Sequence, residues 1–316
     1  MQRYACDWCD YDDSYDDGYD DGYDDGGSNY EGCDKMVQLS VLKIEEYGPW
    51  TLTLGSDREH ELQMLQSRLY DRVQSLFSER DCLVFANRAD ELFALSSGLG
   101  VDGHVAIQDA LAAEFADIRV RMSIGSGRTP AAADAAAAGA TRAADTRNAG
   151  DNGGGNHERA GMIFGGDAAA QSDSGDNVSI MHMDIDGLSG RRRRGASPYE
   201  ISLLMFGLYH KMSEYFYREY ESLAFFMGGD NFMIVCSDEA RESGGRGFVD
   251  AVERQDGIRL NCGIGSGRNG REAAMRATES LDMIRKMRDE SGSSSNSAGS
   301  EGEWPRVYEH ATGRRL

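Results

Sequence analysis

The chain has 316 residues, and its 54 acidic side chains outnumber 33 basic ones to give a formal net charge of −21. This balance excludes binding to nucleic acids or to anionic membranes, because both surfaces require a basic protein face. No apolar run approaches the ~20 residues of a membrane span. The aspartate-rich N-terminus also lacks the basic and apolar regions of a secretory signal. We therefore expect a cytoplasmic protein.

Much of the negative charge lies at the N-terminus, where residues 1–35 hold twelve acidic and two basic side chains. This segment repeats Tyr-Asp-Asp-Gly and offers little aliphatic surface to bury, so we expect a disordered acidic tail. The remaining chain is also acidic, and only four of the 33 basic residues are lysine. That composition favours a halophilic organism, and the alternative is an ordinary acidic protein with an unusual tail.

Three cysteines lie inside apolar stretches, where we expect them to be small core residues: Cys82, Cys236 and Cys262. The other three lie in the N-terminal tail, where Cys6 and Cys9 form a lone CxxC. No fourth ligand follows closely, which disfavours a zinc site.

Two copies of one unit span residues 37–145 and 178–290. The stretch Ile-Gly-Ser-Gly-Arg begins at Ile124, and a matching Ile-Gly-Ser-Gly-Arg begins at Ile264, an offset of 140 (264 − 124). Asp90 and Asp230 share that offset, and both lie between short apolar runs. Several landmarks at a nearly constant offset indicate an internal duplication.

Each copy predicts strand, helix, strand, strand, helix, strand and helix. In the first copy, a capping box at Ser56 predicts a helix start after the first strand. In the second copy, Ser197 and the proline after it predict a second helix start, and a two-strand hairpin follows that helix. The expected elements are strands at 37–44, 82–86, 92–95, 118–125, 178–186, 223–227, 232–236 and 258–265, and helices after Ser56, after Pro130, from Ser197 to about Glu221, at 247–254 and at 270–287.

These elements predict an α+β fold of two tandem ferredoxin-like βαββαβ units. We expect an acidic tail at 1–35, a first repeat at 36–146 and a disordered linker or insertion at 147–177, rich in Gly, Asp, Asn and Ser. The second repeat spans 178–290, and 291–316 is a C-terminal extension that docks on the body or hangs free. Because many functions use this fold, function must be argued from residues.

Carboxylates end the first strand of the second copy and also occupy its hairpin. Asp184 and Asp186 close the strand, and Asp230 follows Gly228 and Gly229. Strands one and three are neighbours in this topology, so we expect Asp184 and Asp230 within bridging distance. Such a pair favours a hard divalent cation that bridges to phosphate, and the glycines let a ligand approach the backbone. Ordinary turn chemistry is the less favoured alternative, and a solvent-facing Asp186 is about as plausible as a functional one.

A glycine-containing loop follows the same strand. The backbone N–H groups of Leu188, Ser189 and Gly190 are candidates to cradle a phosphate. Four arginines at 191–194 come next. They would attract a triphosphate, although a solvated loop explains them equally well.

The first copy offers a different set at the matching position. Glu45, Tyr47 and Trp50 lie in Glu-Glu-Tyr-Gly-Pro-Trp-Thr. Composition favours Trp50 as a core residue, and the alternative is that it walls a base-binding pocket. Arg68 is a candidate phosphate clamp, although an exposed helical arginine is the commoner case. The histidines show no ligand spacing, and neither a P-loop nor a serine nucleophile elbow is present.

Several of these motifs together resemble the archaeal GTP cyclohydrolase III family. The matching stretches are Phe225–Met233, Tyr47–Thr51, Leu65–Tyr70 and 263–267. The resemblance covers roughly 36–135 and 178–290 and implies a fold similar to nucleotidyl cyclase and polymerase palm domains, doubled in one chain. Met36 resembles a natural start for this family, which suggests that residues 1–35 are an extension.

The resemblance implies a Mg²⁺-dependent hydrolase that acts on C–N bonds in cyclic amidines. It would open the guanine imidazole ring of GTP and release inorganic phosphate and a formamidopyrimidine ribonucleotide monophosphate for flavin and deazaflavin biosynthesis. By position, Asp184 and Asp230 match the palm metal carboxylates, and the Ile185 carbonyl is a possible third ligand. Asn231 joins the two aspartates as a catalytic candidate. The implied substrate-binding residues are Gly228, Gly229, Leu188, Ser189, Gly190, Glu45, Tyr47, Trp50 and Arg68.

The first copy departs from the family pattern. Glu45 stands where the family tends to have aspartate, and Arg88 and Ala89 replace the two glycines, so we expect this copy to complete the pocket or a homo-oligomer. Asp186, Asn231 and Glu45 are candidates for general acid–base work. A nucleotidyl or diguanylate cyclase and a non-catalytic GTP sensor remain as alternatives.

Overall fold

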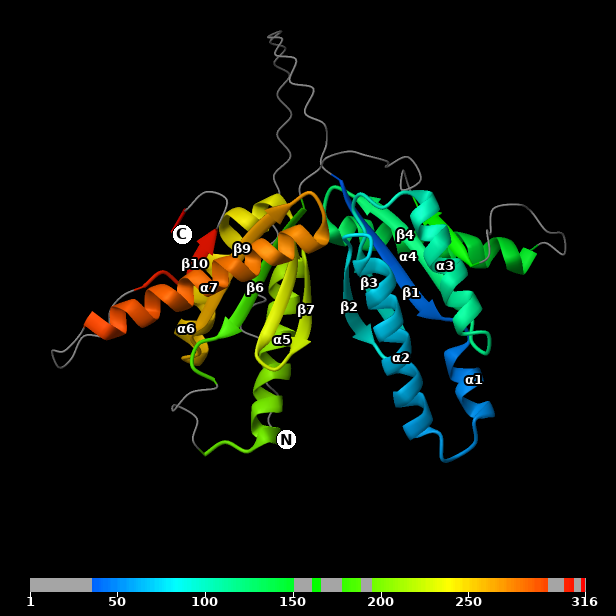
Figure 1. Ribbon diagram of the computed structural model, residues 1–316, viewed down its shortest axis with the longest axis horizontal. Coiled ribbons are helices and arrows are strands. Elements are labelled where there is room, and N and C mark those ends of the chain that lie inside the picture. Colours follow the sequence, from blue (N-terminus) through cyan, green and yellow to red (C-terminus); the bar gives the residue numbers. More distant parts are fainter. Residues whose placement is uncertain are drawn as a thin grey trace, which may run out of the picture. The chain divides into compact units, whose positions relative to one another are not determined.

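The computed structural model describes residues 36–150, 161–165, 178–188, 195–294, 304–309 and 314–315 (Figure 1). The expectations for residues 1–35, for Ser189 and Gly190, and for the arginines at 191–194 lie outside these residues. Within them, the fold is α+β with two mixed sheets, which confirms the predicted fold class. None of the described helices has the length and apolarity to span a membrane.

The first repeat has the sheet order β2-β3-β1-β4-β5. Strand β1 pairs antiparallel with both β3 and β4, so strands one and three of the repeat are neighbours, as expected. The elements are β1 (Val37–Ile44), α1 (Tyr47–Thr53), α2 (Glu59–Ser78), β2 (Leu83–Arg88), β3 (Glu91–Leu95), α3 (Val101–Glu114), β4 (Val120–Gly127), α4 (Pro130–Gly150) and β5 (Met162–Gly165).

The second repeat has the sheet order β11-β10-β9-β6-β8-β7. Strand β6 lies between β8 and β9, as β1 lies between β3 and β4. The elements are β6 (Val178–Ile185), α5 (Pro198–Tyr220), β7 (Leu223–Gly228), β8 (Asn231–Cys236), a π-helical turn (Ala240–Gly244), α6 (Gly245–Asp256), β9 (Leu260–Gly267), α7 (Gly270–Ser294), β10 (Val307–Glu309) and β11 (Arg314–Arg315).

The two predicted capping boxes have different outcomes. At α5, Ser197 Oγ accepts from the Glu200 backbone N–H, and the Glu200 carboxylate accepts from the Ser197 N–H, which confirms the prediction. At α2, the prediction from Ser56 is wrong, because the helix begins at Glu59 and Arg58 occupies the N-cap without a side-chain bond. The unpredicted helix α1 ends just before, and Gly55 at φ +82° turns the chain between the two helices.

Each sheet has a fifth strand that the βαββαβ pattern does not contain. Strand β5 pairs parallel with β4, and β10 pairs parallel with β9. These short strands cover backbone groups that would otherwise form a free edge. Their three or four residues are too few to give a clear alternating signal in the sequence.

The shared Ile-Gly-Ser-Gly-Arg stretch is explained by close packing of a helix on a strand. A Cβ on Gly265 would lie 2.5 Å from the Ala273 carbonyl oxygen, and one on the matching Gly125 would lie 2.1 Å from the Ala133 oxygen. The last helix of each repeat therefore touches the strand backbone, which only glycine permits.

Apolar side chains form a core in each repeat and a third cluster that both repeats share. In the shared cluster, the rings of Phe85 and Phe225 stack with centroids 4.2 Å apart. Cys82, Cys236 and Cys262 are buried, which confirms their prediction as core residues.

Candidate functional site

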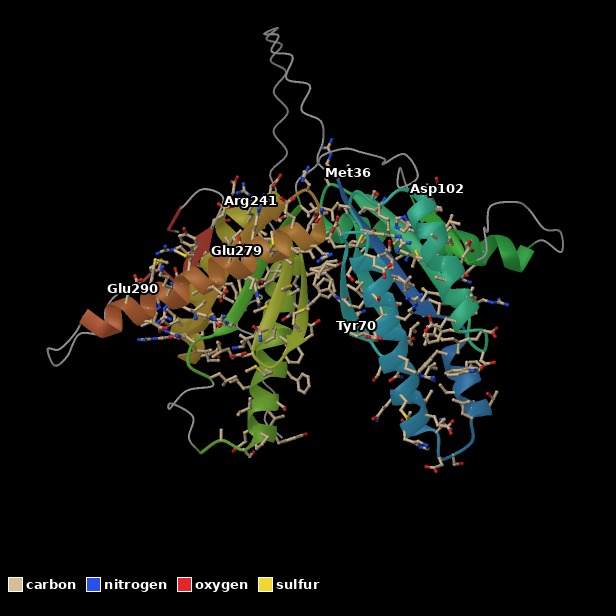
Figure 2. The ribbon with its side chains drawn as sticks, in the orientation of Figure 1. Met36, Tyr70, Asp102, Arg241, Glu279 and Glu290 are labelled. Atoms are coloured by element: carbon tan, nitrogen blue, oxygen red, sulfur yellow. The ribbon has the colours of Figure 1, made fainter. Side chains whose placement is uncertain are left out.

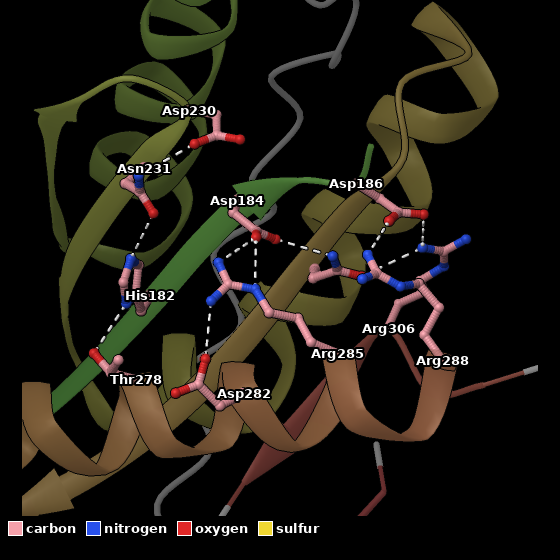
Figure 3. A network of polar contacts seen from close by, with 11 residues as sticks. His182, Asp184, Asp186, Asp230, Asn231, Thr278, Asp282, Arg285, Arg288 and Arg306 are labelled. Carbon is pink, nitrogen blue, oxygen red and sulfur yellow. Dashed lines mark hydrogen bonds and ion pairs between the residues drawn. The ribbon is translucent and has the colours of Figure 1, made fainter. Parts of the chain in front are cut away.

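A row of polar side chains crosses the second sheet at the end of β6. Asp184 lies opposite Asn231 of β8 and opposite Asn261 of β9. Directly opposed residues project to the same face of a sheet, and on this face α7 supplies a further side chain, Arg285 (Figure 3). Asp184 is only 6% exposed.

Both carboxylate oxygens of Asp184 accept hydrogen bonds. One accepts from Asn261 Nδ2 at 2.9 Å, and the other accepts from Arg285 Nη2 at 2.7 Å and Nε at 3.3 Å. The guanidinium compensates a carboxylate whose burial would otherwise be unfavourable.

Asp186, two residues further along, is held by two arginines. Its Oδ1 accepts from Arg288 Nη1 at 3.0 Å, and its Oδ2 accepts from Arg306 Nη1 at 2.8 Å. Burial by itself raises the pKa of Asp186, but the hydrogen bonds and charges of Arg306 and Arg288 outweigh it and lower that pKa. Asp186 is therefore an ionised, paired carboxylate and not a solvent-facing one.

A chain of hydrogen bonds links α7 to the hairpin tip (Figure 3). The Nδ1 of His182 lies 3.1 Å from Thr278 Oγ1, and its Nε2 lies 3.1 Å from Asn231 Oδ1. Asn231 Nδ2 in turn donates to Asp230 Oδ1 at 3.2 Å. Burial lowers the pKa of His182 although Asn231 and Asp184 act in the opposite direction. A neutral ring that donates from Nε2 fits this arrangement, and His182 thereby orients the Asn231 amide toward Asp230.

The hairpin requires its two glycines. Gly228 has φ +94° and Gly229 has φ +63°, and a Cβ on Gly228 would meet no atom within 4 Å. The backbone before Asp230 is therefore both left-handed and open to an approaching ligand. At the corresponding positions of the first repeat, Arg88 and Ala89 do not have positive φ, so the two hairpins differ in conformation.

The loop after β6 is described only as far as Leu188. The Leu188 N–H donates to the Ile185 carbonyl at 3.4 Å, and the Leu188 side chain packs against the second core. The Ile185 carbonyl, a candidate metal ligand, therefore already accepts one hydrogen bond.

The first repeat inverts the charges of this site. Lys43 occupies the place of Asp184, because it lies opposite Glu91 and Arg121 as Asp184 lies opposite Asn231 and Asn261. Arg121 Nη1 donates to Asp145 Oδ1 at 2.6 Å, and Arg121 also pairs with Glu45, the counterpart of Asp186. With a lysine in place of the first aspartate, this repeat lacks the carboxylate pair expected of a palm metal site.

A cavity of about 890 Å³ lies in the first repeat, and all its lining residues belong to that repeat. Glu45 and Trp50 line it, together with Lys43, Arg121 and Arg142. Trp50 is half-buried, so the prediction that it is a core residue is wrong. The tryptophan instead forms part of a wall of the cavity.

The other two candidates of the first repeat lie differently. Tyr47 packs against Trp50 with ring centroids 6.1 Å apart, and its hydroxyl accepts from Gln66. Arg68 is exposed on α2 and does not line the cavity. The structure thus separates the sequence candidates into a hairpin group in the second repeat and a cavity group in the first, formed by Glu45 and Trp50 with Tyr47 beside it, while Arg68 belongs to neither.

Sequence reasoning missed most of the polar shell around Asp184 and Asp186. The missed residues are His182, Asn261, Arg285, Arg288 and Arg306. A helical spacing offered one signal, because Thr278 and Arg285 are seven residues apart and lie on the same face of α7. Arg306 offered none, because it reaches the site from the short segment just before β10, far from Asp186 in the sequence.

Comparison with known proteins identifies the family. The family model described as GTP cyclohydrolase III matches residues 37–295, and the chain belongs to this family. It is 33% identical over 254 residues to GTP cyclohydrolase III of Natronomonas pharaonis, covering 78% of this chain and 94% of the relative. It is 32% identical over 250 residues to the Methanococcus vannielii protein of the same name, covering 79% and 89%.

Among solved structures, the chain is similar to a bacterial light-regulated adenylyl cyclase. The similarity covers 88% of this chain and 86% of the cyclase, with 9% identity and a TM-score of 0.33.

Proposed function

We propose that this chain hydrolyses GTP and opens the imidazole ring of its guanine. The product is 2-amino-5-formylamino-6-(5-phosphoribosylamino)pyrimidin-4(3H)-one, released with inorganic phosphate and available for flavin and deazaflavin biosynthesis. One observation carries the proposal: the family match extends over residues 37–295 and includes both repeats and the Asp230 hairpin. Relatives that align over about nine-tenths of their own length carry the name GTP cyclohydrolase III.

Magnesium fits the donor chemistry at the hairpin of the second repeat. Mg²⁺ is usually held by one or two carboxylates and completes its shell with water and substrate phosphates. Asp184, Asp230 and the Ile185 carbonyl are the proposed ligands, and the ion would supply charge neutralisation for the triphosphate. Arg285 and Asn261 each hold one oxygen of Asp184, so an ion bound there would share an oxygen with, or displace, one of these two donors.

Ring opening requires water to add to the carbon between the two imidazole nitrogens, after which the bond to the ribose-bearing nitrogen breaks and that nitrogen takes a proton. Asp186 is a weak base for this step, because its pKa is lowered. Asn231 is engaged through both its amide oxygen and its nitrogen. We therefore assign both residues to orientation of the site.

The cavity of the first repeat is the proposed pocket for the nucleotide base. Its volume of about 890 Å³ lies within the range of small-molecule sites. Trp50 offers a face for stacking. The lining also contains both basic and acidic side chains that can hydrogen-bond a base: Lys43, Arg119, Arg121 and Arg142 with Glu45, Glu46, Glu91, Asp117, Asp134 and Asp145. Glu45 holds Arg121 in the wall.

We further propose that the protein works in high salt and self-associates. Tyr199, Leu203 and Phe206 project from α5 at helical spacing and are 74%, 56% and 60% exposed. Light scattering at several salt concentrations tests the association.

A single assay tests the proposed reaction. The protein is incubated with GTP and Mg²⁺ in high salt, and purine absorbance and free phosphate are followed together. Loss of the purine chromophore with phosphate release supports the proposal. An unchanged chromophore with a cyclic product indicates a cyclase, and binding without either change indicates a sensor.

A further inference from the structure

The segment 304–309 lies beyond the family match, which ends at residue 295, yet it is built into the second sheet. Strand β10 pairs parallel with β9, with Val307 opposite Cys262, and the Cys262 N–H donates to the Arg306 carbonyl at 2.8 Å. Val307 is 2% exposed in the second core. The backbone of Arg306 is therefore fixed by the sheet.

Two further contacts anchor this strand. Glu309 is 4% exposed, and its Oε1 accepts from Arg241 Nη1 at 2.9 Å; Figure 2 labels Arg241. The Arg306 guanidinium lies 4.7 Å from the centre of the Trp304 ring, a cation–π contact. The direction of the Arg306 side chain is thus set by its own neighbours as well as by its acidic partner.

Arg306 joins two parts of the candidate site. Its Nη1 donates to Asp186 Oδ2 at 2.8 Å and to Asn261 Oδ1 at 3.3 Å. Because Arg306 engages the amide oxygen, the Asn261 nitrogen points to Asp184, where it donates to Oδ1 at 2.9 Å. A reversed amide would place two donors against each other at Arg306 and two acceptors against each other at Asp184.

The first repeat provides an internal comparison. There the Met122 N–H donates to the Gly161 carbonyl at 2.9 Å, just before β5, as Cys262 donates to Arg306 before β10. Glycine thus stands in the first repeat where arginine stands in the second. Glu45 is instead paired with Arg119 and Arg121, which belong to the β4 side of its own sheet. Arg306 is therefore found only in the repeat that also has Asp184 and Asp186.

We propose that Arg306 is a positioning residue of the candidate site, which fixes Asp186 directly and Asp184 through the Asn261 amide. The expected loss of activity rests on the proposed function. The expected placement of Asp186 and of the Asn261 amide rests only on the contacts described above. Residues that orient ligating carboxylates typically change activity 10- to 100-fold when removed.

The test compares Arg306→Ala, Arg306→Lys and the matched control Glu309→Gln. Glu309→Gln weakens the anchoring of the same strand without touching the aspartates. We expect Arg306→Ala to lower kcat by about 10- to 100-fold with a smaller change in KM. Arg306→Lys should recover part of the loss, because an ammonium can still reach Asp186, and Glu309→Gln should stay within about 2-fold of wild type.

A second measurement needs no turnover. In protein labelled with ¹⁵N-asparagine, the Asn261 side-chain amide signal, assigned with Asn261→Asp, should shift in Arg306→Ala and remain in place in Glu309→Gln. Equal kcat in Arg306→Ala and wild type together with an unmoved Asn261 signal overturns the proposal. A wild-type protein that leaves GTP intact overturns the proposed function instead, and the amide signal then still decides the positioning role.

Discussion

The guanidinium of Arg285 donates both Nη2, at 2.7 Å, and Nε, at 3.3 Å, to one carboxylate oxygen of Asp184. The partners lie 101 residues apart in the sequence, on α7 and β6. In the first repeat Asp145 of α4 stands at the position of Arg285, and it pairs with Arg121 of β4, the counterpart of Asn261, while Lys43 stands at the position of Asp184. The last helix of each repeat thus forms an ion pair with the sheet, to β6 in the second repeat and to β4 in the first, and only in the second repeat does the sheet contribute the carboxylate.

Arg285→Gln should destabilise the fold, because it leaves the Asp184 carboxylate buried with Asn261 as its remaining amide partner. Breaking a fully buried pair costs about 3–5 kcal/mol, and partial exposure of Arg285 reduces our expectation to about 1–3 kcal/mol. Urea denaturation measures the difference. The control is Arg218→Gln, which removes an exposed pair with Glu214 on α5. Equal stability of the two variants would contradict the structural role of Arg285.

Asp230→Ala should reduce GTP turnover by more than about 100-fold, or roughly 2.7 kcal/mol, with the circular dichroism spectrum retained. The reason is the loss of a proposed metal ligand at an open hairpin tip. The matched control is Asp90→Ala in the first hairpin, where Lys43 replaces the partner carboxylate, and there we expect turnover near wild type. The assignment of metal binding to the second repeat fails if Asp90→Ala is the more damaging change.

Trp50→Ala should raise KM for GTP about 10-fold with little effect on kcat, because it removes a stacking face worth about 1–3 kcal/mol. Trp50→Phe should keep KM within about 3-fold, since it preserves an aromatic ring. Steady-state kinetics on the two variants gives the result. An unchanged KM in Trp50→Ala would show that the cavity of the first repeat does not hold the base.

His104 should make the fold sensitive to acid. It is 1% exposed, with Nε2 at 2.9 Å from Ser40 Oγ and Nδ1 at 2.9 Å from the Gly100 carbonyl. Burial lowers its pKa to about 4, against an opposing hydrogen bond to Gly100. Between about pH 6.5 and pH 4, His104 is therefore protonated in the unfolded chain but neutral in the folded chain. The free energy of unfolding consequently falls by about 3 kcal/mol as the pH drops through this range.

The measurement for this prediction is urea denaturation between pH 7 and pH 4 on wild type, His104→Gln and His60→Gln. The first variant should lose part of the pH dependence. The second should keep the wild-type profile, because the His60 side chain is 62% exposed. Parallel profiles for wild type and His104→Gln would refute the role of His104.

The duplication, the fold class and the hairpin could be predicted from the sequence, because none of them depends on knowing which distant residues come into contact. Hydrophobic period, capping residues and paired glycines act over a few positions, and the offset of 140 needs only the chain itself. The Ser56 capping box failed because the competing helix α1 takes up the residues before it. The short strands β5 and β10 carried too little pattern to be predicted.

The tertiary structure decided what surrounds the aspartates. Asp184 and Asp186 could be found from the end of a strand, but their partners Asn261, Arg285 and Arg306 come from β9, α7 and the segment before β10. Sheet register brings these elements together, and a register is a long-range property that no local pattern contains. The same holds for Trp50, whose place in a cavity wall depends on how α1 lies against the first sheet. The sequence by itself determined which groups are available, and folding determined which charges each of them faces.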